Sequence, residues 1–123
     1  NTRLTEARQL VDLCKQFAVP LIINDDIALA MKVDADGVHL GKNDLSISVA
    51  RVSLGNNAMI GVSCYNNLDR AKEAVMAGAD YLAFGAFFPS PSKPDAVHAK
   101  PEIIGRAKQQ FDLPVVAIGG PLV

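Results

Sequence analysis

Five short apolar runs, separated by longer segments with helical periodicity, constrain the fold of this 123-residue chain more than any other feature. The runs are nearly continuous in Val, Ile and Leu, which is typical of strands buried on both faces of a parallel sheet. They occupy Val19–Asn24, Gly37–Gly41, Ala58–Ser63, Asp80–Gly85 and Pro114–Ile118. Because strands and helices alternate along the chain, the sequence predicts an α/β fold with one parallel sheet.

The segments between these runs carry signals for the start and end of helices. Thr5 can cap a first helix whose buried stripe is expected to be Leu10, Leu13, Cys14 and Phe17. The residues expected to begin or end the later helices are Asp25 or Asp26, Ser46, Asn67, Gly78 and Pro101.

Two four-residue phrases, Ala35–Val38 and Ala79–Leu82, resemble each other at the entrance to two of the expected strands. In both, an Ala and an Asp precede the strand. The similarity indicates a weak internal repeat of one strand–helix unit, and no linker or low-complexity segment divides the chain.

Charge and composition exclude several classes of partner. Twelve Lys and Arg nearly balance 13 Asp and Glu, and no basic stripe indicates nucleic acid or an anionic membrane surface. No apolar run approaches the ~20 residues that a membrane span needs. Cys14 and Cys64 have no metal-binding spacing, so two free thiols in a reducing cytoplasm are expected.

Polar residues gather where the expected strands end, which is the edge at which α/β folds bind ligands. Asn24 and Asp25 end one strand, Asp44 follows the next, and Ser63 ends the third. Neighbouring parallel strands lie about 4.8 Å apart, so Asp25 and Asp44 could share one Mg²⁺. The alternative is that each carboxylate caps the following helix.

A proline-stiffened loop follows the fourth strand and carries Ser90, Ser92 and Lys93. Prolines at positions 89, 91 and 94 limit its conformations. Two hydroxyls and an ammonium group on such a loop predict a phosphate or pyrophosphate site. A surface turn rich in turn-forming residues is the alternative.

Four further residues give weaker indications of function. The backbone of Gly119 and Gly120 can approach a ligand closely, although a tight turn is the simpler interpretation. His39, in the middle of a strand, is expected to be a hydrogen-bonded interior histidine rather than a base. Tyr65 follows Ser63 with no visible activating partner in the sequence.

Five motifs occur in one order, and together they resemble the thiamine phosphate synthase family over almost the whole chain. They are Pro20–Asp25, Asp36–Gly41, Ile60–Ser63, Phe88–Lys93 and Val115–Gly120. The resemblance implies a (β/α)₈ TIM barrel, of which residues 1–123 would form a single incomplete domain. The chain is expected to begin before the third barrel strand and to stop after the seventh, and therefore to be a poor catalyst alone.

The resemblance also implies an activity, a magnesium-dependent transfer reaction. The family joins hydroxymethylpyrimidine diphosphate to hydroxyethylthiazole phosphate and releases pyrophosphate. The implied Mg²⁺ ligands are Asp25 and Asp44. The implied contacts to the pyrimidine diphosphate are Asn24, Ser63 and Lys93. The implied contacts to the thiazole phosphate are Ser90, Ser92, Gly119 and Gly120.

The residues fit this chemistry, because the reaction develops negative charge on the leaving pyrophosphate. Mg²⁺ and Lys93 would stabilise that charge, Ser63 would donate a hydrogen bond to it, and no general base is required. Two alternatives stay open: a thiazole tautomerase-like isomerase with no need for Mg²⁺, and a non-catalytic phosphate-binding fragment. The tautomerase uses a His at the place held by Tyr65. The expected partners are small molecules, and a homo-oligomer is left open.

Overall fold

Helices and strands alternate throughout the described part of the chain. The computed structural model describes residues 2–41, 45–88 and 99–119, and only the backbone at 45 and 46. The helices are α1 (Thr2–Gln16), α2 (Ile27–Val33), α3 (Leu45–Leu54), α4 (Leu68–Ala77) and α5 (Glu102–Gln110). The strands are β1 (Ile22–Asn24), β2 (Gly37–Leu40), β3 (Met59–Tyr65), β4 (Tyr81–Gly85) and β5 (Val115–Ile118).

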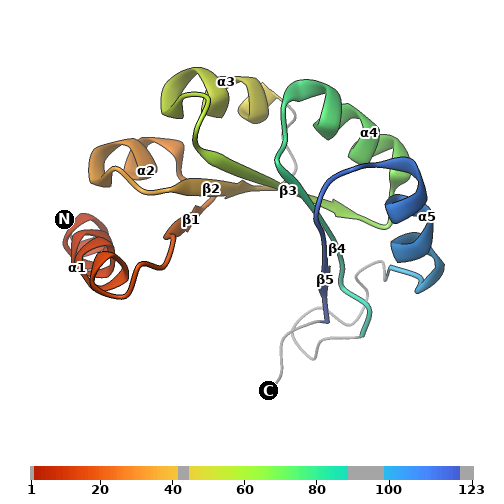
Figure 1. The fold of residues 1–123 in the computed structure, drawn as a ribbon, viewed down its shortest axis with the longest axis horizontal. Coiled ribbons are helices and arrows are strands. Elements are labelled where there is room, and N and C mark those ends of the chain that lie inside the picture. The colour runs from red at the N-terminus through yellow and green to blue at the C-terminus, as the bar shows by residue number, and fades with distance from the viewer. Residues whose placement is uncertain (1, 42–44, 89–98, 120–123) are drawn as a thin grey trace.

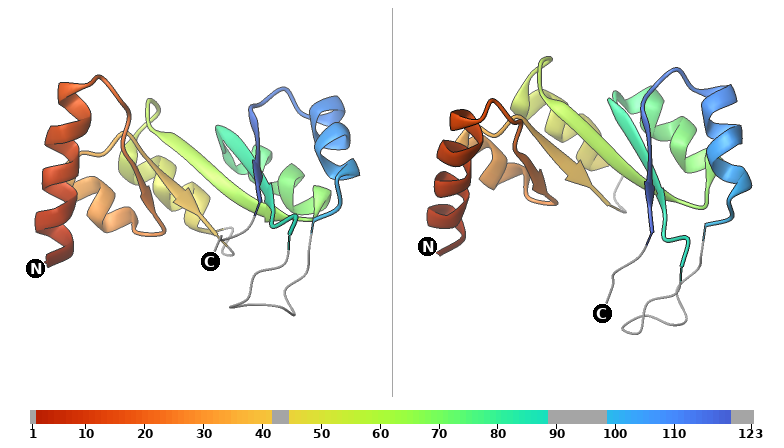
Figure 2. Two further views of the ribbon diagram at one scale, coloured as in Figure 1. Left: turned by 90° about the horizontal axis from the view of Figure 1, so that it is seen from below. Right: turned by 60° about the horizontal axis from the view of Figure 1, so that its bottom comes forward.

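The five strands form one parallel sheet in the order β1-β2-β3-β4-β5, which confirms the predicted α/β class. The sheet is curved, and α2 to α5 follow its outer side while α1 lies beside α2 at the β1 end (Figure 1). Figure 2 shows the same one-sided arrangement from below. The described strands leave the sheet open between β1 and β5, so closure into a barrel is not observed among them.

The two faces of the sheet differ in what covers them. Side chains on the helix-covered face are almost completely buried; they include Val38, Leu40, Ile60, Val62, Leu82 and Phe84. Burying one such side chain stabilises the fold by about 1.5–3 kcal/mol. On the concave face, register places Asn24, His39, Gly61 and Tyr81 in one row across β1 to β4.

Gly61 is essential to that row, because the Tyr81 ring crosses it. A Cβ atom at position 61 would lie 1.8 Å from Tyr81 Cζ. The missing side chain is therefore the space that the ring occupies, and it lets Tyr81 reach over β3 toward β2.

Several helix ends agree with the sequence. Asp26 caps α2 by accepting the Leu29 N–H at 2.9 Å, and Asn67 caps α4 by accepting the Arg70 N–H at 3.0 Å. Gly78 ends α4 in the left-handed conformation at φ 106°. These short-range predictions hold because a cap depends on neighbouring residues alone.

The prediction for the first helix is wrong in two respects. Thr5 lies inside α1, which already begins at Thr2. The buried residues of α1 are Ala7 and Val11, whereas Phe17 is 70% exposed and Leu10 and Leu13 are also exposed. The helix packs against α2, and Leu10 and Leu13 lie on the half-exposed side of the helix.

The repeated Asp residues fasten the amino edge of the sheet. Asp36 Oδ2 accepts the Leu21 N–H at 2.7 Å, and Asp80 Oδ2 accepts the Ile60 N–H at 2.8 Å. Each carboxylate thus binds the backbone at the start of the preceding strand. The internal repeat therefore has a structural cause, since at both places an Asp carboxylate accepts a hydrogen bond from the equivalent backbone N–H of the preceding strand.

Arg51 of α3 completes this edge. Its Nη2 donates to Asp80 Oδ2 and to the Gly78 carbonyl, both at 2.6 Å, and its Nη1 donates to the Ala58 carbonyl at 2.8 Å. The guanidinium therefore joins the turns that precede β3 and β4. No helix among the described residues is both long and apolar enough to cross a membrane.

Candidate functional site

Asp25 lies at the carboxyl edge of the sheet, directly after β1. Its backbone is left-handed, with φ 62°, and its N–H donates to the His39 carbonyl at 2.8 Å. Its Oδ1 accepts the Gly41 N–H at 3.2 Å. Asp26, and not Asp25, caps the following helix. The helix-cap alternative is therefore wrong for Asp25, whose exposed carboxylate is turned toward the end of β2.

A carboxylate in this position is suited to a hard cation. Mg²⁺ typically binds one or two protein carboxylates and completes its shell with water and phosphate oxygens. Within the described ranges, no three His, Cys, Asp or Glu residues gather as a complete protein metal site. Among the described residues, Asp25 is one exposed carboxylate that could contribute to such a shell. The other predicted ligand, Asp44, lies outside the described residues.

Ser63 is held by a hydrogen-bonded chain on the concave face. His39 Nε2 lies 2.7 Å from Ser63 Oγ, and His39 Nδ1 lies 2.8 Å from the Tyr81 hydroxyl. The His39 and Tyr81 rings are stacked, with centroids 5.6 Å apart. The prediction of a hydrogen-bonded interior histidine is confirmed, because both ring nitrogens of His39 have a partner.

The electrostatic surroundings keep His39 neutral. Burial lowers the pKa of His39 below its usual value, and the nearby Asp25 carboxylate opposes this effect only in part. Burial also raises the pKa of the Tyr81 hydroxyl. At neutral pH the hydrogen-bonded chain on the concave face therefore consists of a neutral imidazole between two hydroxyl groups.

Tyr65 belongs to the same edge, although no partner for it was visible in the sequence. The β3–β4 register shifts between Ser63 and Tyr65, and Tyr65 has φ 58°. A bulge of this kind redirects a side chain. A Cβ atom on Gly41 would lie 3.6 Å from Asp25 Oδ1 and 3.7 Å from the Tyr65 hydroxyl, so both groups surround Gly41. The signal available in the sequence was the two-residue spacing from Ser63.

Arg70 lies beneath this edge, in the first turn of α4. Its Nε donates to the Ser63 carbonyl at 2.8 Å, and its Nη2 donates to the Gly41 carbonyl. The guanidinium carbon lies 5.4 Å from the centroid of the Tyr65 ring. One side chain therefore contacts the ends of both β2 and β3.

A small cavity opens on the concave face beside Ser63. It has a volume of about 150 Å³ and lies at the carboxyl ends of β3, β4 and β5. Its lining residues are Ser63, Tyr65, Ala83, Gly85, Ala86 and Ile118. The predicted serine thus faces a space with mainly apolar walls, which suits the ring of a small substrate.

The remaining predicted residues are only partly placed. Asn24 is exposed at the end of β1, beside His39 in register. The Gly119 carbonyl accepts the Phe88 N–H at 2.9 Å, so the end of β5 adjoins the residue that precedes the proline-rich segment. The predicted residues outside the described part of the chain are Asp44, Ser90, Ser92, Lys93 and Gly120.

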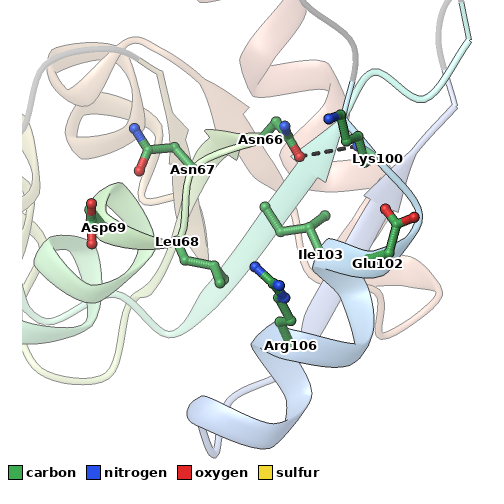
Figure 3. A pocket seen from close by; sticks show the side chains of 8 residues that line it. All are labelled: Asn66, Asn67, Leu68, Asp69, Lys100, Glu102, Ile103 and Arg106. Atoms are coloured by element: carbon green, nitrogen blue, oxygen red, sulfur yellow. Dashed lines mark hydrogen bonds between the residues drawn. The ribbon is translucent and has the colours of Figure 1, made fainter.

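A larger cavity, of about 520 Å³, lies elsewhere, between the amino ends of α4 and α5 (Figure 3). Lys100 and Arg106 line it together with Asp69 and Glu102, and Asn66 Oδ1 accepts the Lys100 N–H at 3.1 Å. Charges of both signs around an open groove favour no ligand class. The convergence of Asp25, Ser63 and Tyr65 therefore outweighs cavity size in locating the site.

Comparisons with known proteins identify the family of this chain. A family model described as thiamine monophosphate synthase matches residues 1–121. The chain is similar to the thiamine-phosphate synthase of an Azoarcus species, with 58% identity over 96% of this chain and 57% of the relative. The corresponding protein of Nitrosomonas eutropha is 54% identical over 96% of this chain and 56% of its own length.

A solved structure is similar as well. It is a thiamine phosphate pyrophosphorylase from Pyrococcus furiosus, with a TM-score of 0.82 and 36% sequence identity. The match covers 98% of this chain and 58% of that structure. The chain therefore spans somewhat more than half the length of the relatives it matches.

Proposed function

The chain belongs to the thiamine monophosphate synthase family, and from this we propose that the intact protein is a thiamine-phosphate synthase. It would join hydroxymethylpyrimidine diphosphate to hydroxyethylthiazole phosphate and release pyrophosphate. The observation that carries the proposal is the Asp25 carboxylate, which is not used as a helix cap and lies at the edge that holds Ser63. Relatives named as synthases favour this transferase over the isomerase alternative.

The fold proposed for residues 1–123 is one incomplete (β/α)₈ barrel domain that contributes strands three to seven. A curved parallel sheet with helices on one side supports it (Figure 1). Val116 and Ile118, on the concave face, are 42% and 43% exposed, and Phe17, directly after α1, is exposed at the other end. Further barrel strands would cover apolar surfaces of this kind.

Asp25, together with Asp44, would hold Mg²⁺. When bound there, Mg²⁺ would neutralise charge on the diphosphate and on the pyrophosphate that leaves. Asn24 and Lys93 would contact the same diphosphate. Ser90, Ser92, Gly119 and Gly120 would contact the thiazole phosphate, in line with the adjacency of Phe88 and Gly119.

Ser63 has a defined part in this reaction. If its only hydroxyl hydrogen is donated to the diphosphate, Ser63 Oγ must accept the Nε2–H of neutral His39, and Nδ1 must accept the Tyr81 O–H. The tautomer of His39 is then fixed by the two hydroxyls. All three donors point along one direction, toward the group on which negative charge develops.

The bond changes need no base from the protein. The bond between the pyrimidinylmethyl carbon and the diphosphate oxygen breaks, and its electron pair leaves with pyrophosphate. The thiazole nitrogen then forms the new bond to that carbon. The protein's contribution is to hold the two substrates together and to stabilise the leaving anion.

The test is synthesis of thiamine phosphate by the intact protein from the two substrates with Mg²⁺, followed by chromatography. We expect product with Mg²⁺ and none after chelation. A folded protein that forms no product would contradict the proposal and favour the non-catalytic alternative. Assays in cell fractions would test the cytoplasmic location, which remains a prediction from the free thiols of Cys14 and Cys64.

A further inference from the structure

The ladder of hydrogen bonds between β2 and β3 ends just before the candidate site. Its last paired residues are Leu40 and Val62. The next carbonyls along the two strands belong to Gly41 and Ser63, and both accept hydrogen bonds from the Arg70 guanidinium. Arg70 therefore supplies a side-chain connection between the two strands where the backbone ladder has stopped.

Each of the two strand ends holds one half of the candidate site. The Gly41 N–H binds the Asp25 carboxylate, and Ser63 carries the hydroxyl that faces the cavity. The Arg70 guanidinium binds the carbonyls of these same two residues. The relative position of Asp25 and Ser63 thus depends on a group that need not touch the substrate.

The third contact of Arg70 extends this support to Tyr65. The guanidinium lies against the ring at 5.4 Å, and the ring sits after a bulge with φ 58°. A residue other than glycine needs support from its surroundings to hold this positive-φ conformation. Stacking on Arg70 gives such support and holds the Tyr65 hydroxyl beside Gly41.

We propose that Arg70 is a positioning residue of this site, which fixes the spacing of Asp25, Ser63 and Tyr65 by joining the ends of β2 and β3. The inference rests on the proposed function, because it concerns the residues that would hold the pyrimidine diphosphate and its cation. A guanidinium is required for it, since its planar fork reaches two carbonyls and an aromatic face at once. A lysine ammonium group at the same place can satisfy only part of this set.

The test compares Arg70→Lys and Arg70→Gln with Arg51→Lys in the intact protein. Arg51 is the matched control, because it also joins neighbouring strands but at the opposite edge. For both Arg70 variants, we expect kcat/KM for the pyrimidine diphosphate to fall about 10- to 100-fold, because small misplacements of reacting groups are costly. We expect the KM for thiazole phosphate to stay within about twofold, because Gly119 lies at the end of β5, away from Arg70. The control Arg51→Lys should keep the wild-type values of kcat/KM for the pyrimidine diphosphate and of KM for the thiazole phosphate.

The outcomes separate the two proposals. Arg70 variants with wild-type kcat/KM for the pyrimidine diphosphate, or with a KM for the thiazole phosphate raised by more than about twofold, would overturn the positioning role. If Arg70→Gln does not fold, Arg70→Lys alone decides. If the wild-type protein makes no thiamine phosphate, the proposed function fails. In that case, calorimetric titration with Mg²⁺ and pyrophosphate tests the role of Arg70. Weaker pyrophosphate binding by the variant than by the wild type supports the inference, and unchanged binding overturns it.

Discussion

Arg51 and Arg70 use the same chemistry at opposite edges of one sheet. Arg51 binds carbonyls before β3 and β4, and Arg70 binds carbonyls after β2 and β3. Arg51 also pairs with Asp80 at 2.6 Å, within a network made of turns. Arg70 instead lies beside Tyr65 and binds the backbone of Ser63 and of Gly41, whose N–H binds the Asp25 carboxylate. In barrel enzymes the amino edge serves stability and the carboxyl edge serves catalysis, and the roles that we propose for the two arginines would follow this division.

The largest effect is expected for Asp25→Asn at the carboxyl edge. Loss of the carboxylate charge should lower Mg²⁺-dependent kcat/KM at least about 100-fold, while the fold is retained because Asp26 provides the cap. Steady-state kinetics and thermal melting would measure the two effects. Asp26→Asn is the matched control, since Asn is an equally good cap. Comparable activity of both variants would remove Asp25 from the site.

At the amino edge, Arg51→Ala should act on stability instead. It removes hydrogen bonds to four carbonyls and leaves Asp80, which is partly buried, without its cation. We expect the free energy of unfolding to fall by about 2–3 kcal/mol, with kcat per folded molecule unchanged. Urea unfolding combined with kinetics below the transition would measure this. A changed KM with unchanged stability would break the comparison of the two edges.

A smaller effect on turnover is expected for Ser63→Ala. One hydrogen bond to the leaving group is lost, and His39 Nε2 loses its partner. About a 10-fold fall in kcat follows if the hydroxyl contributes 1–2 kcal/mol in the transition state, an order of magnitude typical of such bonds. Ser63→Thr, which keeps the hydroxyl, should recover part of the rate. Equal rates for alanine and wild type would exclude a catalytic role of Ser63.

The smallest effect is expected in the pH dependence of stability. The pKa of His39 is lowered in the folded state, so the unfolded chain binds more protons around its usual pKa of about 6.5. Stability should therefore fall as the pH drops through about 6.5, and continue to fall until the lower folded pKa is passed. The slope from one proton is at most about 1.4 kcal/mol per pH unit. His39→Gln should remove this part of a melting-temperature profile, and an identical profile would contradict it.

Short-range patterns in the sequence predicted the strands and several caps well. The apolar runs located β1 to β5, and Asn67 and Gly78 were identified because their role depends on adjacent backbone. The buried stripe of α1 was not predicted correctly, because the elements that pack against a helix decide which of its faces is buried. Periodicity alone does not show whether the face of α1 that carries Val11 or the face that carries Leu13 packs against α2.

The site was predictable only in part for a related reason. Asp25 and Ser63 stand at strand ends and can be found from strand positions. Tyr65 and Arg70 join the site through a bulge and through contacts between α4 and two strands, which are long-range features. The chain of His39, Ser63 and Tyr81 likewise requires the register of three strands. Sequence spacing contains no direct record of that register.

The space above Gly61 has a consequence for how this enzyme family can vary. A methyl group there would take the place of the Tyr81 ring. Displacing the ring removes the hydroxyl that lies 2.8 Å from His39 Nδ1, and His39 then keeps only its hydrogen bond with Ser63. Glycine at position 61 therefore preserves the hydrogen-bonded chain of Tyr81, His39 and Ser63, although it carries no functional group itself.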